Sequence, residues 1–316
     1  MKMLIWIILI FLAIFILINI LYKNTNHYKN SIANVKKFID GVPNNLEIIN
    51  LGSSYSMYGY SYDDIPLNGF NMALSPQSFM YDFKILKQYS SYLSEGCIVL
   101  LNITILSFGE NENYKDDMIN HKYYHFLKKD KIENYSLLKY LKIIYFPLLF
   151  KPSLVSFIIK DSVKNNDFSV QYNQYKLNDI TKIANNRLAG WSNSFNLNNM
   201  IEGEQVSSHL EAVKEKKTIL ENMINYCYEK GFRPVIVIPP VSGILRDKIS
   251  IKFVKNFLYR NIENLEVPVL DYWFNEEFKD KELYIHCDFL NAKGRGKFTK
   301  KVLDDLKLYH HISISN

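Results

Sequence analysis

The 316-residue sequence contains only three cysteines, Cys97, Cys227 and Cys287, and no two of them have CxxC spacing. This scarcity excludes a scaffold held by many disulfides and a zinc ribbon. Twelve glycines and nine prolines are too few for a collagen-like or low-complexity chain. The net charge of +6 is modest and the basic residues are spread along the chain, so no nucleic-acid partner is predicted. A hydrophobic content of 48% predicts a folded chain with a substantial core.

A long apolar run is present near the N-terminus. Residues 4–22 carry no charge and only one amide side chain, Asn19. As a helix this run spans about 28 Å, close to the ~30 Å thickness of the bilayer hydrocarbon. It is longer than the apolar part of a typical cleaved signal peptide, and no small-residue cleavage site follows it. We therefore predict a transmembrane signal anchor at 4–22, with a cleaved signal as the alternative, and a juxtamembrane linker at 23–45.

Short apolar runs alternate with helical patterns after this linker. Strands are predicted where the apolar runs are short, at 46–51, 69–72, 97–102, 235–238 and 267–271. Helices are predicted where apolar residues have helical spacing, at 76–93, 206–230 and 296–308. This alternation predicts an α/β fold, a three-layer sandwich with a central parallel sheet of about five strands. Residues 110–200, rich in Lys, Asn, Asp and Tyr, are predicted to be a partly helical insertion.

A serine motif follows the first predicted strand. The strand runs directly into Gly52-Ser53-Ser54. A serine at a strand-to-helix turn can act as a nucleophile, because the turn exposes its hydroxyl and the helix N-terminus offers N–H groups to an oxyanion. The alternative is that Ser53 or Ser54 only caps the following helix.

Three segments together resemble the SGNH/GDSL hydrolase superfamily. They are Gly52-Ser53-Ser54, the stretch FNMALSPQS at 70–78, and the stretch LNAKGRGKFT at 290–299. The resemblance is to membrane-anchored members that act on cell-surface polymers, including the D-alanyl-lipoteichoic-acid biosynthesis proteins. It covers residues 46–110 and 205–308 and implies a flavodoxin-like SGNH domain over 46–309, with a tail at 310–316.

The resemblance also implies roles for individual residues. Ser54 corresponds to the nucleophile. The groups that hold the oxyanion in the superfamily correspond to the Ser54 N–H, the backbone near Ala73 and Ser75, and the Asn102 side chain. The charges around the anchor do not fix its orientation, because Lys2 lies on one side and Lys23 and Lys29 on the other. The resemblance implies an extracytoplasmic domain on a single-pass anchor in the cell membrane.

The base expected by the superfamily is missing. The superfamily has Asp-x-x-His directly before Leu-Asn, whereas this chain has Phe289 in the His position and His286 in the Asp position. A serine hydroxyl is a weak nucleophile without a base. Three hypotheses remain open: His286 is the base with Asp288 orienting it, Asp288 acts as the base, or the site binds without catalysis.

Two functions follow from these alternatives. The first is an esterase or O-acyltransferase acting on acyl esters of surface polysaccharide. The second is an inactive SGNH-fold protein that binds or assembles envelope glycans. The expected partners are the cell membrane, an acylated glycan or acyl donor, and a membrane protein of envelope biosynthesis. His121 and His125 have i, i+4 spacing but no third ligand nearby, so neither a metal nor another cofactor is predicted.

Overall fold

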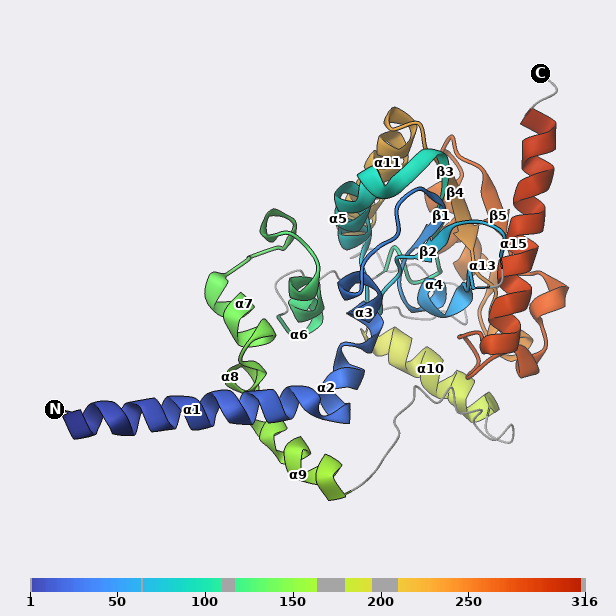
Figure 1. Ribbon diagram of the computed structural model, residues 1–316. Coiled ribbons are helices and arrows are strands. Elements are labelled where there is room, and N and C mark those ends of the chain that lie inside the picture. Colours follow the sequence, from blue (N-terminus) through green and yellow to red (C-terminus); the bar gives the residue numbers. More distant parts are fainter. Residues whose placement is uncertain (1, 64, 110–116, 164–179, 195–209, 314–316) are drawn as a thin grey trace. The chain divides into compact units, whose positions relative to one another are not determined.

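The chain divides into two compact units. The computed structural model describes residues 2–63, 65–109, 117–163, 180–194 and 210–313 (Figure 1). Unit 1 comprises residues 1–42 and 113–171, and unit 2 comprises residues 43–112 and 172–316. The boundary falls inside the predicted insertion, so the later part of that insertion belongs to the same unit as the predicted strands.

Unit 2 contains a five-stranded sheet in the order β2-β1-β3-β4-β5. All four neighbouring pairs are parallel, which confirms the predicted α/β class. The strands are β1 (Leu46–Leu51), β2 (Gly69–Asn71), β3 (Leu93–Asn102), β4 (Arg233–Ile238) and β5 (Val269–Asp271).

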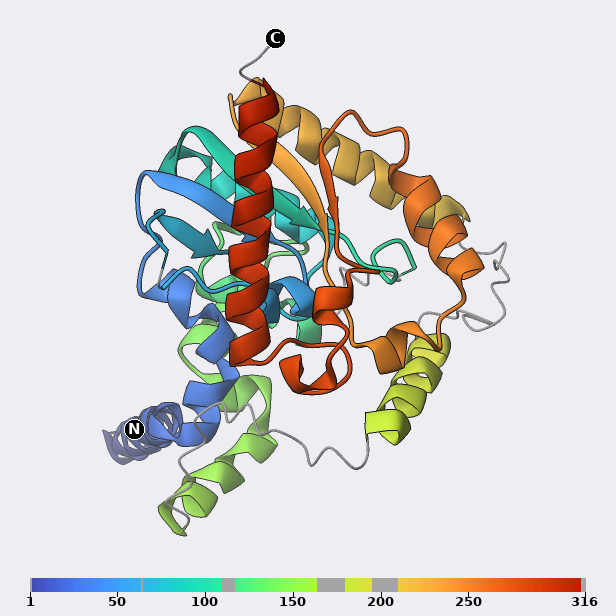
Figure 2. The same cartoon turned by 90° about the vertical axis from the view of Figure 1, so that its right-hand side faces the viewer.

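Helices lie on both sides of this sheet. Figure 1 shows α5 and α11 on one side and α15 on the other, and Figure 2 shows α15 crossing the face of the sheet. This arrangement has the layers of the predicted sandwich. The helices of unit 2 are α4 (Ser54–Gly59), α5 (Phe79–Tyr89), α10 (Ile180–Ser194), α11 (Leu210–Glu229), α12 (Gly243–Arg246), α13 (Ile251–Val254), α14 (Arg260–Ile262) and α15 (Ala292–Ser313).

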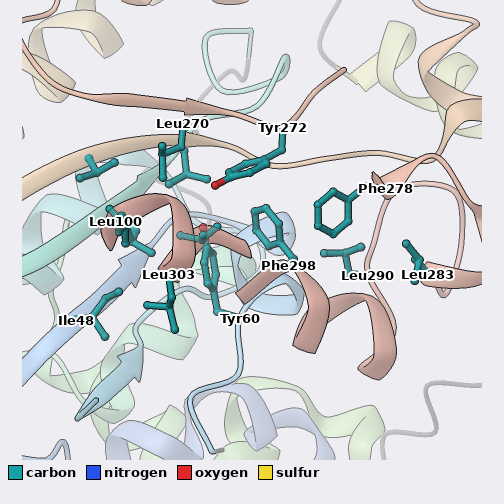
Figure 3. Packing of buried hydrophobic residues seen from close by; sticks show 14 of the residues in the cluster. Ile48, Tyr60, Leu100, Leu270, Tyr272, Phe278, Leu283, Leu290, Phe298 and Leu303 are labelled. Carbon is teal, nitrogen blue, oxygen red and sulfur yellow. The ribbon is translucent and has the colours of Figure 1, made fainter. Parts of the chain in front are cut away.

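The core between α15 and the sheet is aromatic at one end (Figure 3). Phe298 of α15 is fully buried, and its ring centre lies 5.1 Å from that of Tyr272 and 5.3 Å from that of Tyr60. Val302 and Leu306 continue the same face toward aliphatic strand residues such as Ile48. Burial of such side chains is worth about 1.5–3 kcal/mol each, so this face fixes α15 on the sheet.

The order of the strands places a crevice beside β1. The chain leaves β1 to form β2 on one side of it and then returns to form β3 on the other side. In open parallel sheets, ligands bind outside the carboxyl ends of the strands at such a reversal. The segments after β1, β2 and β3 are therefore the place to look for a site.

Unit 1 is helical in its described residues. Its helices are α1 (Lys2–Asn24), α2 (Asn26–Ser31), α3 (Ala33–Ile39), α6 (Asp117–Asn120), α7 (Leu137–Ile144), α8 (Pro147–Phe150) and α9 (Ser156–Val163). Helix α1 is long and apolar enough to cross a membrane. Two short helices, α2 and α3, occupy most of the predicted juxtamembrane linker.

Candidate functional site

A cavity of about 180 Å³ opens at the carboxyl ends of the strands in unit 2. The segments that follow β1, β2 and β3 contribute to its wall, together with α10 and the segment before α15. Its lining residues are Gly52, Ser53, Ser54, Tyr55, Ser56, Pro76, Gln77, Ser78, Phe79, Asp82, Asn102, Thr104, Leu106, Ser107, Arg187, Trp191, Asp288 and Phe289. The cavity therefore unites Ser54, Asn102 and Asp288 of the predicted site.

Ser54 is the first residue of α4 and lies on the cavity wall. Its side chain forms no hydrogen bond with another described residue. Ser53, the residue before it, accepts a hydrogen bond from the Gln77 backbone N–H at 3.2 Å and gives α4 no side-chain cap. The capping alternative is therefore wrong for Ser53, whose side chain caps no N–H group of α4.

The turn before Ser54 is held by a buried carboxylate. Asp82 Oδ1 accepts a hydrogen bond from Gly52 N at 2.8 Å and a second from Gln77 Nε2 at 2.6 Å. Gln77 Nε2 also donates to the Gly52 carbonyl at 3.2 Å. Since Asp82 and Gln77 are both almost fully buried, these bonds fix the serine turn against the segment that follows β2.

Gly52 has a backbone conformation that other residues avoid, with φ at +124°. A Cβ there would lie 3.0 Å from Ser56 Cβ and 3.1 Å from Asn102 Cβ. We expect Gly52→Ala to lower the free energy of unfolding by about 1–3 kcal/mol, because strain and crowding add. Denaturant titration should show this loss. The matched control is Gly190→Ala on α10, where a Cβ meets open space, and which is expected to be neutral or stabilising. Equal losses of unfolding free energy in the two variants would contradict the claim that the turn requires glycine at position 52.

The residues predicted to hold the oxyanion are only partly brought together. Asn102 lines the cavity, but its Nδ2 donates to the Leu51 and Leu100 carbonyls and its Oδ1 accepts from Tyr60. The Ala73 N–H donates to Asn71 Oδ1 at 3.1 Å. Neither Ala73 nor Ser75 is among the residues that line the cavity in the described part of the chain. The Asn102 amide therefore forms its hydrogen bonds within the protein and is not directed at a ligand.

Phe289, the residue found where the motif expected from the resemblance has histidine, lies on the cavity wall. Its ring stacks on Tyr58 with centres 5.1 Å apart and meets the edge of Tyr55 at 5.4 Å. The Arg187 guanidinium lies 5.0 Å from the ring centre, within cation–π range. An apolar ring packed in this way cannot accept a proton from Ser54.

Asp288 is paired with an arginine from α10. Its Oδ2 lies 2.9 Å from Arg187 Nε, and its Oδ1 accepts a hydrogen bond from Arg187 Nη2 at 3.3 Å. The Asp288 side chain is only 1% exposed, whereas that of Arg187 is 34% exposed. Burial raises the pKa of the Asp288 carboxyl, and the positive charge of Arg187 opposes that rise. Asp288 therefore pairs with Arg187 in this structure, and that pairing competes with any role as a base for Ser54.

His286 does not line the cavity among the described residues. Its ring centre lies 6.3 Å from that of Phe289. Partial burial lowers the pKa of His286 below its usual 6.5, so the ring is neutral at pH 7. Burial raises the pKa of the neighbouring Cys287 thiol to about 12, so no thiolate forms there near neutral pH.

Sequence reasoning missed Arg187, and it considered Trp191 only as one of many aromatic residues that either line a carbohydrate groove or pack the insertion onto the sandwich. Both lie on α10, one turn apart, within the segment interpreted as an insertion. Helical spacing of Ile180, Ala184, Leu188 and Trp191 indicates a helix with one buried face, but no local pattern indicates which part of the chain that face covers. The one available signal was composition, because the chain has only five arginines, and arginine is the residue favoured for buried ion pairs.

No family model matches the sequence, and no curated protein matches it. Within the described residues, no group of three or more His, Cys, Asp or Glu side chains is arranged to hold a metal ion.

Proposed function

We propose that the protein is a membrane-anchored, SGNH-like protein that binds acylated glycans of the cell envelope in this cavity without hydrolysing them. One observation carries the proposal. The serine turn Gly52-Ser53-Ser54, whose sequence resembles the superfamily motif, lines the cavity, and the wall beside it carries Phe289 and an Asp288–Arg187 pair instead of an acid–base dyad.

The chemistry of the wall suits a sugar ligand. Hydroxyl groups of Ser53, Ser54, Thr104 and Ser107 line it, and the indole of Trp191 adds an apolar surface. Ligand sites of this kind combine aromatic surface with a few polar groups that fix orientation. The part of the Arg187 guanidinium that remains exposed adds hydrogen-bond donors to the wall, while its charge is paired with Asp288.

Two residues that line the cavity each have a buried polar atom without a partner in the described part of the chain, which favours a polar ligand. Within the part of the chain that the structure describes, Tyr55 Oη and Gln77 Oε1 have no hydrogen-bond partner. Buried polar groups are nearly always paired in native proteins. A bound glycan, or water carried with it, would supply the missing partners.

A second function is favoured by the state of Ser54. Its hydroxyl lines the cavity without an internal hydrogen bond, as expected for a nucleophile. In that case the protein is an esterase or O-acyltransferase. Asp288, whose pKa burial raises, would have to leave Arg187 and take the Ser54 proton, or His286 would have to move into the cavity.

The location we propose is the cell membrane, with unit 2 on the extracytoplasmic side. Retention of the anchor is supported by its packing, because Asn19 and Tyr22 of α1 are each 1% exposed inside unit 1. A cleaved signal peptide would not contribute to the core of the mature protein. The side of the membrane rests on the resemblance to anchored superfamily members.

Glycan binding tests the proposed function. The full-length protein in detergent should bind acetylated or alanylated envelope oligosaccharides on an array, and Ser54→Leu should abolish binding by filling the cavity. Ser91→Leu is the matched control, because Ser91 is exposed in the 3-10 helix Ser90–Tyr92, outside the cavity. Binding that survives Ser54→Leu would place the ligand elsewhere. No binding to any envelope glycan would contradict the proposal.

A further inference from the structure

Helices α8 and α9 of unit 1 pack against the C-terminal half of α1 (Figure 1). The Leu148 N–H donates to Asn19 Oδ1 at 3.2 Å, and Lys23 Nζ donates to the Ile144 carbonyl at 3.1 Å. The rings of Phe15 and Phe146 are 5.5 Å apart. Asn19, the only amide in the apolar run, thus supplies an acceptor to the first turn of α8.

These contacts use one stripe of α1. Phe15, Ile18, Asn19 and Tyr22 have i, i+3, i+4, i+7 spacing and are buried or half-buried. Tyr22 and Ile18 belong to a cluster with Leu148, Phe157 and Ile158. The remaining faces of the same turns stay apolar and exposed, including Leu17 at 55% and Ile20 at 51%. The second half of α1 is therefore half covered by protein and half open to lipid.

The length of α1 determines how deep these contacts lie. From Leu4 to Ile14, before the first contact, the helix spans only about 16 Å at about 1.5 Å per residue, roughly half of the hydrocarbon thickness. If α1 crosses the bilayer, residues 15–22 must also lie in it. The α7–α8 junction, which contacts Phe15 and Asn19, must then lie at the same depth.

The surface of α7–α9 suits that location. Large apolar side chains are exposed on these helices and the turns between them, namely Leu137 (63%), Leu138 (61%), Leu141 (37%), Tyr145 (51%), Leu149 (49%), Val155 (46%) and Ile159 (72%). Among the described residues of the larger unit 2, only Tyr228, Ile251 and Phe274 are large, apolar and exposed. Such a concentration on one short stretch marks an interaction surface.

We propose that α7, α8 and α9 are embedded in the leaflet that holds the C-terminal half of α1, at the boundary between acyl chains and headgroups. Figure 1 shows α7 on one side of α1 and α9 on the other. Residues 137–163 contain four lysines, Lys139, Lys142, Lys151 and Lys160, and one acid, Asp161. This excess of positive charge complements anionic lipid headgroups. The membrane anchor then consists of α1 together with α7, α8 and α9. This proposal does not depend on what the cavity of unit 2 binds.

Depth measurements in vesicles test this proposal with the full-length protein. Leu138→Cys and Ile159→Cys each carry an environment-sensitive NBD fluorophore, and Ile251→Cys is the matched control, an exposed isoleucine of unit 2 at 48%. The protein without an added cysteine gives the background, since Cys97, Cys227 and Cys287 are buried. The vesicles contain phosphatidylcholine and phosphatidylglycerol, with or without nitroxide-labelled lipid.

The fluorophores at positions 138 and 159 should emit at shorter wavelength than the one at 251. Nitroxide lipid should reduce their emission at least about twofold, while aqueous iodide should quench only the control. All three side chains are exposed, so the substitutions leave the core intact. Iodide quenching at 138 or 159 equal to that at 251 would overturn the proposal. That result is also expected if a protein partner, absent from these vesicles, covers the surface instead of lipid.

Discussion

Replacing His286 by Asp and Phe289 by His is expected to make Ser54 react with a fluorophosphonate at least about a hundredfold faster than in the unchanged protein. The double variant restores the Asp-x-x-His order of the superfamily before Leu290-Asn291. Position 289 lies on the wall that Ser54 also lines, and Arg187 beside it would keep a histidine there neutral and able to accept a proton.

Three controls belong to this experiment. Phe289→His alone should give a smaller gain, because a histidine without its carboxylate is less well oriented. Ser54→Ala in the double variant should remove the reaction. Unfolding by denaturant should show that the double variant remains folded. A folded double variant that stays as inert as the unchanged protein would mean that Ser54 is not placed as a superfamily nucleophile.

Replacing Arg187 by Leu is expected to lower the free energy of unfolding by about 2–4 kcal/mol at pH 7. The change leaves the Asp288 carboxylate, 1% exposed, without its charge partner. The estimate is below the full cost of an orphaned buried charge, because Arg187 is 34% exposed and solvent screens part of the pair. Lys301→Leu is the control, because it breaks the more exposed pair of Lys301 with Asp305 and should cost at most about 1 kcal/mol.

The pH dependence gives the Arg187 variant a distinctive signature. The pKa of Asp288 is raised in the folded protein, and removing Arg187 raises it further. A carboxyl with a raised pKa in the folded state favours folding at low pH and loses that advantage as the pH rises through its folded pKa. The difference in unfolding free energy between Arg187→Leu and the unchanged protein should therefore become smaller as the pH falls from 7 toward 4. Asp288→Asn added to Arg187→Leu should recover part of the loss at pH 7. A difference in unfolding free energy that does not change with pH would contradict the claim that Arg187 and Asp288 form a stabilising ion pair.

The positions of the strands could be predicted from the sequence because each strand is a short apolar run. The predicted strand at 46–51 coincides with β1, and the other four overlap β2 to β5. The helix predicted at 76–93 was too long, since α5 ends at Tyr89 and β3 begins at Leu93. Gly96, which lies just past the predicted end of this helix, is inside β3 with φ at +72° and donates to the Gly231 carbonyl. A local pattern cannot distinguish a glycine after a helix from a glycine within a strand.

The site was harder to predict than the fold. Ser54 and Asp288 could be selected because each lies beside a motif, and both line the cavity. Arg187 lies 101 residues before Asp288, and a contact across that distance leaves no trace in hydrophobic periodicity. The same reason explains why the link between Asn19 and Leu148, 129 residues apart, could not be predicted. Each contact has one partner, Arg187 or Leu148, in the segment that local sequence describes only as an insertion.

Fluorophosphonate labelling of the full-length protein in detergent, beside Ser54→Ala, tests most directly whether the cavity binds without catalysis. We predict no labelling that depends on Ser54, because the wall beside it carries Phe289 rather than a base and Arg187 pairs with Asp288. A reactive serine hydrolase in the same detergent serves as the positive control. Rapid labelling that disappears in Ser54→Ala would contradict this prediction and establish an activated serine in the cavity.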